Sequence, residues 1–205
     1  MEKKLKSKKE LRNEILRLRD ALSEEERNEK SHHIAEKVIA QKEFTEADKV
    51  LLFASFKSEV GTQEIFEAAR TAGKSVYYPK ILGKEMEFFL VEKAEDLSEE
   101  YWGIREPEAI LERKFFANPE EKICVIMPGA VFDVEGNRIG YGGGYYDKFL
   151  QKLEIEFSTQ QREVYKIAVA FECQMTELGN IISETYDIKP NCIITEKRKL
   201  LIIAC

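Results

Sequence analysis

Apolar residues recur at helical spacing through the first forty residues of the chain. A capping-box sequence at 7–10 opens the first predicted helix, and a second capping box at 23–26 opens another. Four apolar residues share one face of the first helix: Leu11, Ile15, Leu18 and Leu22. The second helix has its own apolar face and is expected to end near Gln41. The pattern therefore predicts two consecutive amphipathic helices.

Short apolar runs bounded by charged or turn residues follow, and each has the length of a buried strand. They lie at 50–54, 75–78, 86–91, 123–127, 166–171, 192–195 and 200–204. Between them we expect a helix from Thr62 to Gly73 and another from Tyr145 to Leu153. Pro79 is expected to end its strand, and Pro107 to lie in the first turn of a short helix.

This alternation of short strands and helices predicts an α/β fold, with an open, mostly parallel sheet and helices on both faces. There is no internal repeat, low-complexity segment or obvious linker, so residues 1–205 are predicted to form one domain. That length is ample for a hydrophobic core.

The composition narrows the class of protein. Apolar residues make up 43% of the chain and charged residues 34%, with no apolar run near the roughly 20 residues that span a bilayer. The sequence starts MEKKLKSKKE without an apolar stretch behind it, which favours the cytoplasm. The four cysteines are far apart, and His32 and His33 lie away from any motif, so neither residue type indicates chemistry.

Charge is distributed unevenly along the chain. The first 20 residues carry a net charge of +4, while the whole chain carries −6. A basic arm on an acidic body favours an anionic small-molecule ligand over nucleic acid. The alternative is that this arm is simply a solvated helix face.

One stretch, GNRIGYGGGYYDK at 136–148, holds five of the chain's 11 glycines. It lies between a predicted strand that ends at Met127 and a helix that begins near Gly144. Glycine permits close approach of a ligand, successive N–H groups can bind an anion, and a helix N-terminus adds partial positive charge. The stretch is thus predicted to bind phosphate, although GxxxxGK[ST] and GxGxxG are both absent. A tight glycine turn packed by tyrosines is the alternative.

Charged side chains within this stretch extend the prediction. Arg138 carries the guanidinium group that pairs best with phosphate. Asp147, in the first helical turn, offers an oxygen ligand for Mg²⁺, or else a partner for the helix dipole. Asp187 is a candidate second carboxylate, but sequence spacing alone does not bring it close to Asp147.

The stretch from Met127 to Asp147 strongly resembles the signature of the 5-formyltetrahydrofolate cyclo-ligase family, also called methenyltetrahydrofolate synthetases. The resemblance extends to Lys8-Lys9-Glu10-Leu11-Arg12, to 55–62 with Glu59, to Trp102-Gly103-Ile104 with Pro107, and to Asp187 with Ile193-Ile194-Thr195. There are departures: Asn191 stands where a second aspartate is expected, and Tyr141 and Gly143 replace the Arg and Lys of some members.

The resemblance implies a Rossmann-like sheet related to phosphosugar isomerases and CoA-transferases, and a reaction that uses ATP and Mg²⁺. The γ-phosphoryl group would be transferred to the formyl oxygen of 5-formyltetrahydrofolate. N10 would then attack the activated carbon, and phosphate would leave to give 5,10-methenyltetrahydrofolate, with ADP as the other product. Such chemistry asks the protein mainly to align two ligands and neutralise charge.

The resemblance also assigns roles to residues. The implied catalytic residues are Arg138, Tyr145 and Asp147, and the implied Mg²⁺ ligands are Asp147 and Asp187. The implied ATP-binding residues are Lys8, Lys9, Glu10, Leu11, Arg12, Arg138, Ile139, Gly140, Tyr141, Gly142, Gly143, Gly144, Tyr145 and Tyr146. The implied folate-binding residues are Ala54, Glu59, Trp102, Tyr141, Gly142, Gly143, Gly144 and Tyr145. Without the resemblance, Trp102 would be interpreted as a core aromatic and Glu59 as a surface glutamate.

Two other functions fit the same residues. One is a different enzyme on this fold, such as a sugar-phosphate isomerase, because fold does not determine function. The other is a protein that binds ATP or folate without turnover. The family includes monomers and homodimers, so the resemblance leaves the oligomeric state open; neither a membrane nor nucleic acid is an expected partner.

Overall fold

The computed structural model describes residues 6–99, 103–118, 120–158, 164–177, 181–182, 184 and 187–203. The helices are α1 (Lys8–Asp20), α2 (Glu24–Ile39), α3 (Lys42–Thr45), α4 (Gln63–Thr71) and α5 (Tyr145–Ser158), with short 3₁₀ turns η1 (Ala94–Asp96), η3 (Leu111–Arg113) and η4 (Glu172–Gln174). The strands are β1 (Lys49–Leu51), β2 (Ser75–Leu82), β3 (Glu85–Leu90), β4 (Leu97–Glu99), β5 (Arg105–Pro107), β6 (Ile123–Met127), β7 (Val131–Phe132), β8 (Arg138–Ile139), β9 (Tyr165–Val169), β10 (Cys192–Ile194) and β11 (Lys199–Leu201).

Within the described residues, seven strands form the main sheet in the order β11-β10-β9-β6-β1-β2-β3. The five inner strands are parallel, while β3 and β11 pair antiparallel at the two edges. This confirms the predicted α/β fold with a mostly parallel sheet. From β1 the chain passes to β2 on one side and later to β6 on the other. The strand order therefore reverses between β1 and β6, and the crevice beyond the carboxyl ends of such strands is where ligands bind in open α/β sheets.

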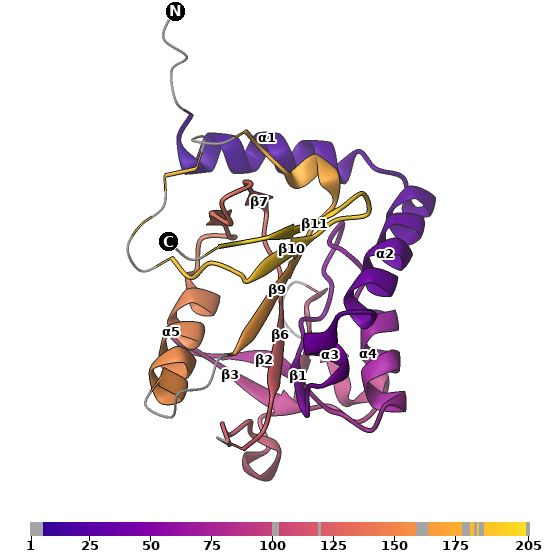
Figure 1. Cartoon of the computed structure of the whole chain (residues 1–205), viewed down its shortest axis with the longest axis vertical. Helices are drawn as coiled ribbons and strands as arrows, with labels where there is room; N and C mark the ends of the chain where they lie inside the picture. The colour runs from indigo at the N-terminus through magenta and orange to yellow at the C-terminus, as the bar shows by residue number, and fades with distance from the viewer. Residues whose placement is uncertain are drawn as a thin grey trace, which may run out of the picture.

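The two faces of the sheet are covered by different helices, as Figure 1 shows, with α2, α3 and α4 on one side and α5 on the other. Alternate residues of each inner strand point to opposite faces. In β1, Val50 packs with the apolar face of α2 and α4, whereas Leu51 packs in the cluster that includes Leu150 of α5. The buried strands thus form two cores. Within the described residues, no helix combines the length and the apolar character needed to cross a membrane.

Helix α1 lies across one end of the sheet (Figure 1) and packs against β7 and η4. Both predicted capping boxes are present, at Ser7 and Ser23. One detail of the predicted apolar face is wrong, because Leu18 is 52% exposed and Arg19 is only 4% exposed. The buried stripe runs in steps of four from Leu11 through Ile15 to Arg19, so that a charged residue occupies the place expected for leucine.

Both proline predictions are wrong. Strand β2 continues through Pro79 to Leu82, and Pro79 lies opposite Phe88 of β3. The N–H of Val91 donates to the carbonyl of Val76, so position 76 of β2 is hydrogen-bonded to β3. Hydrogen-bonded positions alternate along an antiparallel pair, and position 79 is therefore one that makes no hydrogen bond to β3. Strand β1 pairs with β2 only as far as Tyr77, so no N–H is needed on the other side either. Pro107 ends β5 instead of opening a helix.

The segment expected to be one long glycine loop contains a β-hairpin, β7–β8. Its turn is organised by Asp133, which is fully buried and accepts hydrogen bonds from the N–H groups of Glu135 and Asn137 and from the Asn137 amide. Gly136 adopts φ 79° in this turn. One of the five glycines therefore shapes a hairpin, and the exposed part of the loop is reduced to 141–144.

Candidate functional site

The candidate site lies at the carboxyl ends of β1, β6 and β9, where the strand order reverses. A narrow crevice lies there between α1 and the strand ends; its empty volume is about 160 Å³, and it is too narrow to admit a water molecule. Its lining residues come from segments far apart in the sequence: Arg19, Phe53, Glu59, Val60, Pro128, Gly129, Val169 and Gln174. The topology thus brings the glycine loop, the first helix and the Glu59 segment to one edge of the sheet, which sequence spacing did not show.

The glycine loop lies against α1. The Arg12 guanidinium donates from Nη1 to the carbonyl of Gly140 at 3.3 Å. A Cβ on Gly142 would come within 3.4 Å of the same nitrogen, and Gly142 has φ 105°, so this position strongly favours glycine. Residues 141–144 are exposed and lead into the N-terminus of α5. The loop therefore leaves its backbone exposed beside a helix terminus, a setting in which phosphate can bind.

One glycine of the loop has a packing role instead. A Cβ on Gly143 would lie 2.5 Å from Cε2 of the Tyr145 ring. Gly143 therefore makes room for Tyr145, which is half-buried. The tyrosine-packed turn and the phosphate loop were alternatives in the sequence, and this loop has features of both.

Arg138 is paired with Asp147. Its Nη2 donates to Asp147 Oδ1 at 2.6 Å, Nη1 donates to the carbonyl of Pro128 at 3.3 Å, and the side chain is only 6% exposed. Arg138 Nε is buried without a hydrogen-bond partner among the described residues. The two residues predicted to bind phosphate and metal thus hold each other beside the loop.

Asp187 comes to the same place. The N–H of Ile188 donates to Asp147 Oδ1 at 3.2 Å, which brings the chain at 187–188 against the start of α5. Lys8 Nζ lies 3.3 Å from Asp187 Oδ2, which also accepts the N–H of Glu184 at 2.9 Å. The structure therefore brings Ile188, the neighbour of Asp187, into contact with Asp147, while the Asp187 carboxylate lies beside Lys8. No cluster of three or more His, Cys, Asp or Glu side chains suited to a metal occurs within the described part of the chain.

A second group of polar side chains lies further along α1. Arg19 donates from Nε to Ser58 Oγ at 3.0 Å and from Nη1 to the hydroxyl of Tyr141 at 2.7 Å. Glu59 accepts the N–H of Phe56 at 2.9 Å. Burial raises the pKa of Glu59, an effect partly opposed by its hydrogen bond with Tyr141 and by the charge of Arg19. The sequence analysis missed Arg19, although its place four residues after Ile15 was a signal.

Other predicted ATP-site residues have structural contacts. The carboxylate of Glu10 accepts the N–H of Ser7 in the capping box, and these bonds lower its pKa. Leu11 and Ile139 are buried together in the core cluster beneath α1. Lys9 is exposed. Glu10 therefore caps α1, and Leu11 and Ile139 pack α1 against the chain beneath it.

Three predicted site residues remain: Tyr146, Ala54 and Trp102. The Tyr146 ring packs against both cores, and its buried hydroxyl has no hydrogen-bond partner among the described residues. Ala54 is partly buried in the segment that follows β1. Trp102 lies outside the described residues.

Asn191, which stands where the resemblance leads us to expect a second aspartate, lies away from the candidate site. Its side-chain oxygen accepts the N–H of Lys166 at 2.7 Å, and its own N–H donates to the Lys166 carbonyl at 2.8 Å. Lys166 lies at the start of β9 and Asn191 immediately before β10, so this pair is at the amino ends of parallel strands. Asn191 therefore lies at the edge of the sheet opposite the candidate site.

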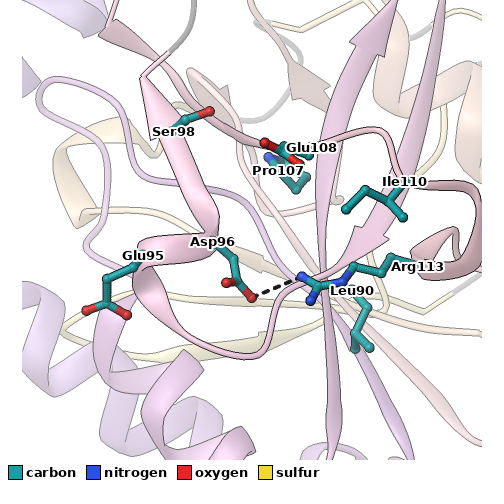
Figure 2. Close-up of a pocket in the computed structure, with 8 residues that line it drawn as sticks. All are labelled: Leu90, Glu95, Asp96, Ser98, Pro107, Glu108, Ile110 and Arg113. Atoms are coloured by element: carbon teal, nitrogen blue, oxygen red, sulfur yellow. Dashed lines mark hydrogen bonds and ion pairs between the residues drawn. The ribbon is translucent and has the colours of Figure 1, made fainter.

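A separate hollow of about 290 Å³ lies beside β4 and β5. Figure 2 shows the Arg113 guanidinium directed at Asp96, and the two are 3.3 Å apart. Two more carboxylates, Glu95 and Glu108, line it. This acidic lining suits phosphate poorly.

Comparisons with known proteins agree on one family. The sequence model of the 5-formyltetrahydrofolate cyclo-ligase family matches residues 4–196. A probable 5-formyltetrahydrofolate cyclo-ligase of Schizosaccharomyces pombe is 30% identical, over 80% of this chain and 83% of that protein. The NMR structure of Aquifex aeolicus 5,10-methenyltetrahydrofolate synthetase aligns with a TM-score of 0.77 and 31% identity, covering 97% of this chain and 94% of that one. A 5,10-methenyltetrahydrofolate synthetase from Mycoplasma pneumoniae aligns with a TM-score of 0.70 and 25% identity, covering 93% and 99%.

Proposed function

The chain belongs to the 5-formyltetrahydrofolate cyclo-ligase family, and from this premise we propose that it converts 5-formyltetrahydrofolate into 5,10-methenyltetrahydrofolate with ATP. The observation that carries the proposal is the convergence of α1, the exposed glycine loop and the Arg138–Asp147 pair at the switch point of the sheet. That convergence supports a nucleotide site beside a second group of polar side chains, as a reaction between two substrates needs.

ATP is proposed to bind between α1 and the glycine loop. Lys8, Arg12 and Arg138 supply positive charge there, and the loop supplies backbone N–H groups. Each cation already has an oxygen partner at 2.6–3.3 Å. Phosphate oxygens would replace or share these partners, so the site holds its cations in place before the nucleotide arrives.

The folate is proposed to bind on the Glu59 side of the crevice, with Tyr141 and Tyr145 at the border between the two ligands. The formyl oxygen attacks the γ-phosphorus, and ADP leaves. N10 then attacks the activated carbon and loses its proton, and inorganic phosphate departs. The protein contributes alignment and electrostatic stabilisation, which can be worth several powers of ten in rate.

The carboxylates fit Mg²⁺ as companions of a nucleotide. Both hydrogen bonds that the described residues make to Asp147 reach Oδ1. Mg²⁺ needs only one or two protein carboxylates when phosphate oxygens and water complete its shell. Asp147 would hold the ion, with Asp187 nearby, and the ion would offset phosphate charge. Asp147→Asn is expected to raise the magnesium concentration for half-maximal turnover by about tenfold, whereas an unchanged magnesium titration would remove Asp147 from this role.

We further propose that residues 1–205 act as one catalytic domain, as a monomer or homodimer in the cytoplasm. The balance of charged and apolar residues and the continuous pair of cores support this.

The proposal is tested by mixing purified protein with 5-formyltetrahydrofolate, ATP and Mg²⁺ and following the near-ultraviolet absorbance of methenyltetrahydrofolate. The expected result is an increase that needs all three components and is matched by equimolar ADP. ATP binding without turnover would instead favour a non-catalytic binding protein or a different acceptor. Turnover of a sugar phosphate without ATP would favour an isomerase on the same fold.

A further inference from the structure

Arg19 is a buried charge that the proposed roles leave unused. Its side chain lies on the buried stripe of α1, where the residue is 4% exposed. Its hydrogen bonds go to two neutral hydroxyl groups, those of Ser58 and Tyr141. No carboxylate in the described parts of the chain lies within ion-pair distance of it, although Glu59 is near enough for the charge of Arg19 to lower the pKa of that carboxyl group. A buried guanidinium without an ion-pair partner is costly, and a residue of this kind calls for a role beyond stability.

The two partners of Arg19 belong to different ligand sites. Ser58 lies in the turn that carries Glu59, and Tyr141 lies in the glycine loop. The guanidinium carbon also lies 5.8 Å from the centre of the Tyr141 ring, within the range of a cation–π contact. Arg19 therefore connects the proposed folate side of the crevice directly to the proposed nucleotide loop.

Helix α1 extends this connection. Arg12, two turns before Arg19, holds the same loop through the carbonyl of Gly140. The loop is thus fixed to one rigid helix at two successive residues, Gly140 and Tyr141. Arg19 also lines the crevice together with Glu59, and the Tyr141 hydroxyl hydrogen-bonds to both side chains, so it links Arg19 to the carboxylate proposed to bind folate.

We propose that Arg19 is a positioning residue for the cyclo-ligase reaction. By holding Tyr141 of the glycine loop against the Ser58–Glu59 turn, it keeps the γ-phosphoryl group and the formyl oxygen in line. This inference rests on the proposed function. Lysine cannot replace arginine here, because the two hydrogen bonds use Nε and Nη1 of one planar fork, and an ammonium group has no such fork.

The test compares Arg19→Lys, Tyr141→Phe and the double variant with wild type. Arg17→Lys is the matched control, because Arg17 lies on the exposed face of the same helix. We expect kcat to fall about 10- to 100-fold in each single variant, since small misplacements of reacting groups have effects of this size. The dissociation constants of ATP and 5-formyltetrahydrofolate, measured by calorimetry, should stay within about threefold of wild type. The double variant should be no slower than the slower single variant, because both changes break the same contact.

Three results would overturn the inference. The first is a wild-type kcat in Arg19→Lys. The second is a loss of kcat that only follows the loss of folded protein, measured by circular dichroism at the assay temperature. The third is a double variant whose effects multiply, since Arg19 would then not act through Tyr141. If Arg19→Lys does not fold, Tyr141→Phe decides alone, because it removes one hydroxyl group, and an unchanged kcat overturns the inference. Failure of the proposed function is distinguishable, because wild type and Arg17→Lys would then both lack turnover.

Discussion

The two halves of α1 hold their positive charges in opposite ways. Near the amino end, the Lys8 side chain is 38% exposed and lies beside the carboxylate of Asp187. Near the carboxyl end, Arg19 is buried and held by neutral hydroxyl groups. An exposed ion pair contributes about 0–1 kcal/mol and exchanges partners easily, whereas a buried charge is rigid and costly. The first arrangement suits a ligand that brings its own charge, and the second suits alignment.

The largest effect is expected from Arg138, the buried cation of the amino-end site. Arg138→Ala should lower kcat about 10²- to 10³-fold, because it removes a cation proposed to stabilise the phosphoryl group and leaves Asp147 without its 2.6 Å partner. Steady-state kinetics under saturating substrates measure this. Arg138→Lys keeps the charge without the fork and should recover only part of the rate. A wild-type kcat in the alanine variant would assign Arg138 to structure alone.

The next effect concerns the folate side. Glu59→Gln should weaken 5-formyltetrahydrofolate binding about 10- to 100-fold, as expected for a buried charged hydrogen bond, and leave ATP binding unchanged. Calorimetry with each ligand alone measures the affinities for 5-formyltetrahydrofolate and for ATP separately. Equal weakening of both ligands would contradict the division of the site into two ends.

The same residue sets an expected pH dependence. Burial raises the pKa of Glu59 above its usual value of 4.5. If the carboxylate is the binding form, wild-type folate affinity falls as the pH decreases through that raised pKa, and it is retained above it. The folate affinity of the Glu59→Gln variant should not change over the same pH range. A wild-type affinity that rises on acidification would mean that the protonated form binds.

A smaller effect is expected from the loop backbone. Gly142→Ala should weaken ATP binding about tenfold, because Gly142 has φ 105° and lies against Arg12. Gly73→Ala is the matched control: Gly73 lies between α4 and β2 with φ 75°, and a Cβ added there would meet no atom within 4 Å. Each variant should lose about 1–2 kcal/mol of stability. Only Gly142→Ala should also bind ATP more weakly. Equal ATP affinity in the two variants would show that the loop does not hold phosphate.

The smallest effect is expected from a residue outside the candidate site, His32. His32 on α2 pairs with Glu64 of α4 at 2.7 Å, and this hydrogen bond raises the pKa of His32 above 6.5. The stabilisation is therefore fully present below pH 6.5 and is lost as the pH rises through the raised pKa. His32→Ala should lower Tm slightly at pH 5.5 and not at pH 8.5, with unchanged turnover. A Tm difference that grows with pH would contradict this sign.

Local signals in the sequence identified much of this molecule. The capping boxes at Ser7 and Ser23, strand β6 and the start of α5 depend on adjacent residues, and all were predicted correctly. The errors came from tertiary context. Pro79 is tolerated within β2 because the neighbouring strand β1 pairs with β2 only as far as Tyr77. Arg19 takes the place of Leu18 on the buried face because hydroxyl groups from distant segments accept its hydrogen bonds.

The sequence predicted which types of residue form the candidate site, but not which of these residues contact one another. The glycine loop, Arg138 and Asp147 were recognisable from composition and spacing. That Ile188, next to Asp187, contacts Asp147, and that Asn191 lies at the opposite edge, depends on how the chain returns between α5 and β10. Spacing along the sequence does not encode that path.

The measurement that tests the central claim most directly is hydrogen–deuterium exchange with each ligand added separately. ATP with Mg²⁺ should slow exchange in 136–148 and at the start of α1, and 5-formyltetrahydrofolate should slow exchange in 55–60. Both together should protect the two regions at once. Protection that appears instead around the hollow at Asp96 and Arg113, with none in the glycine loop, would contradict the account.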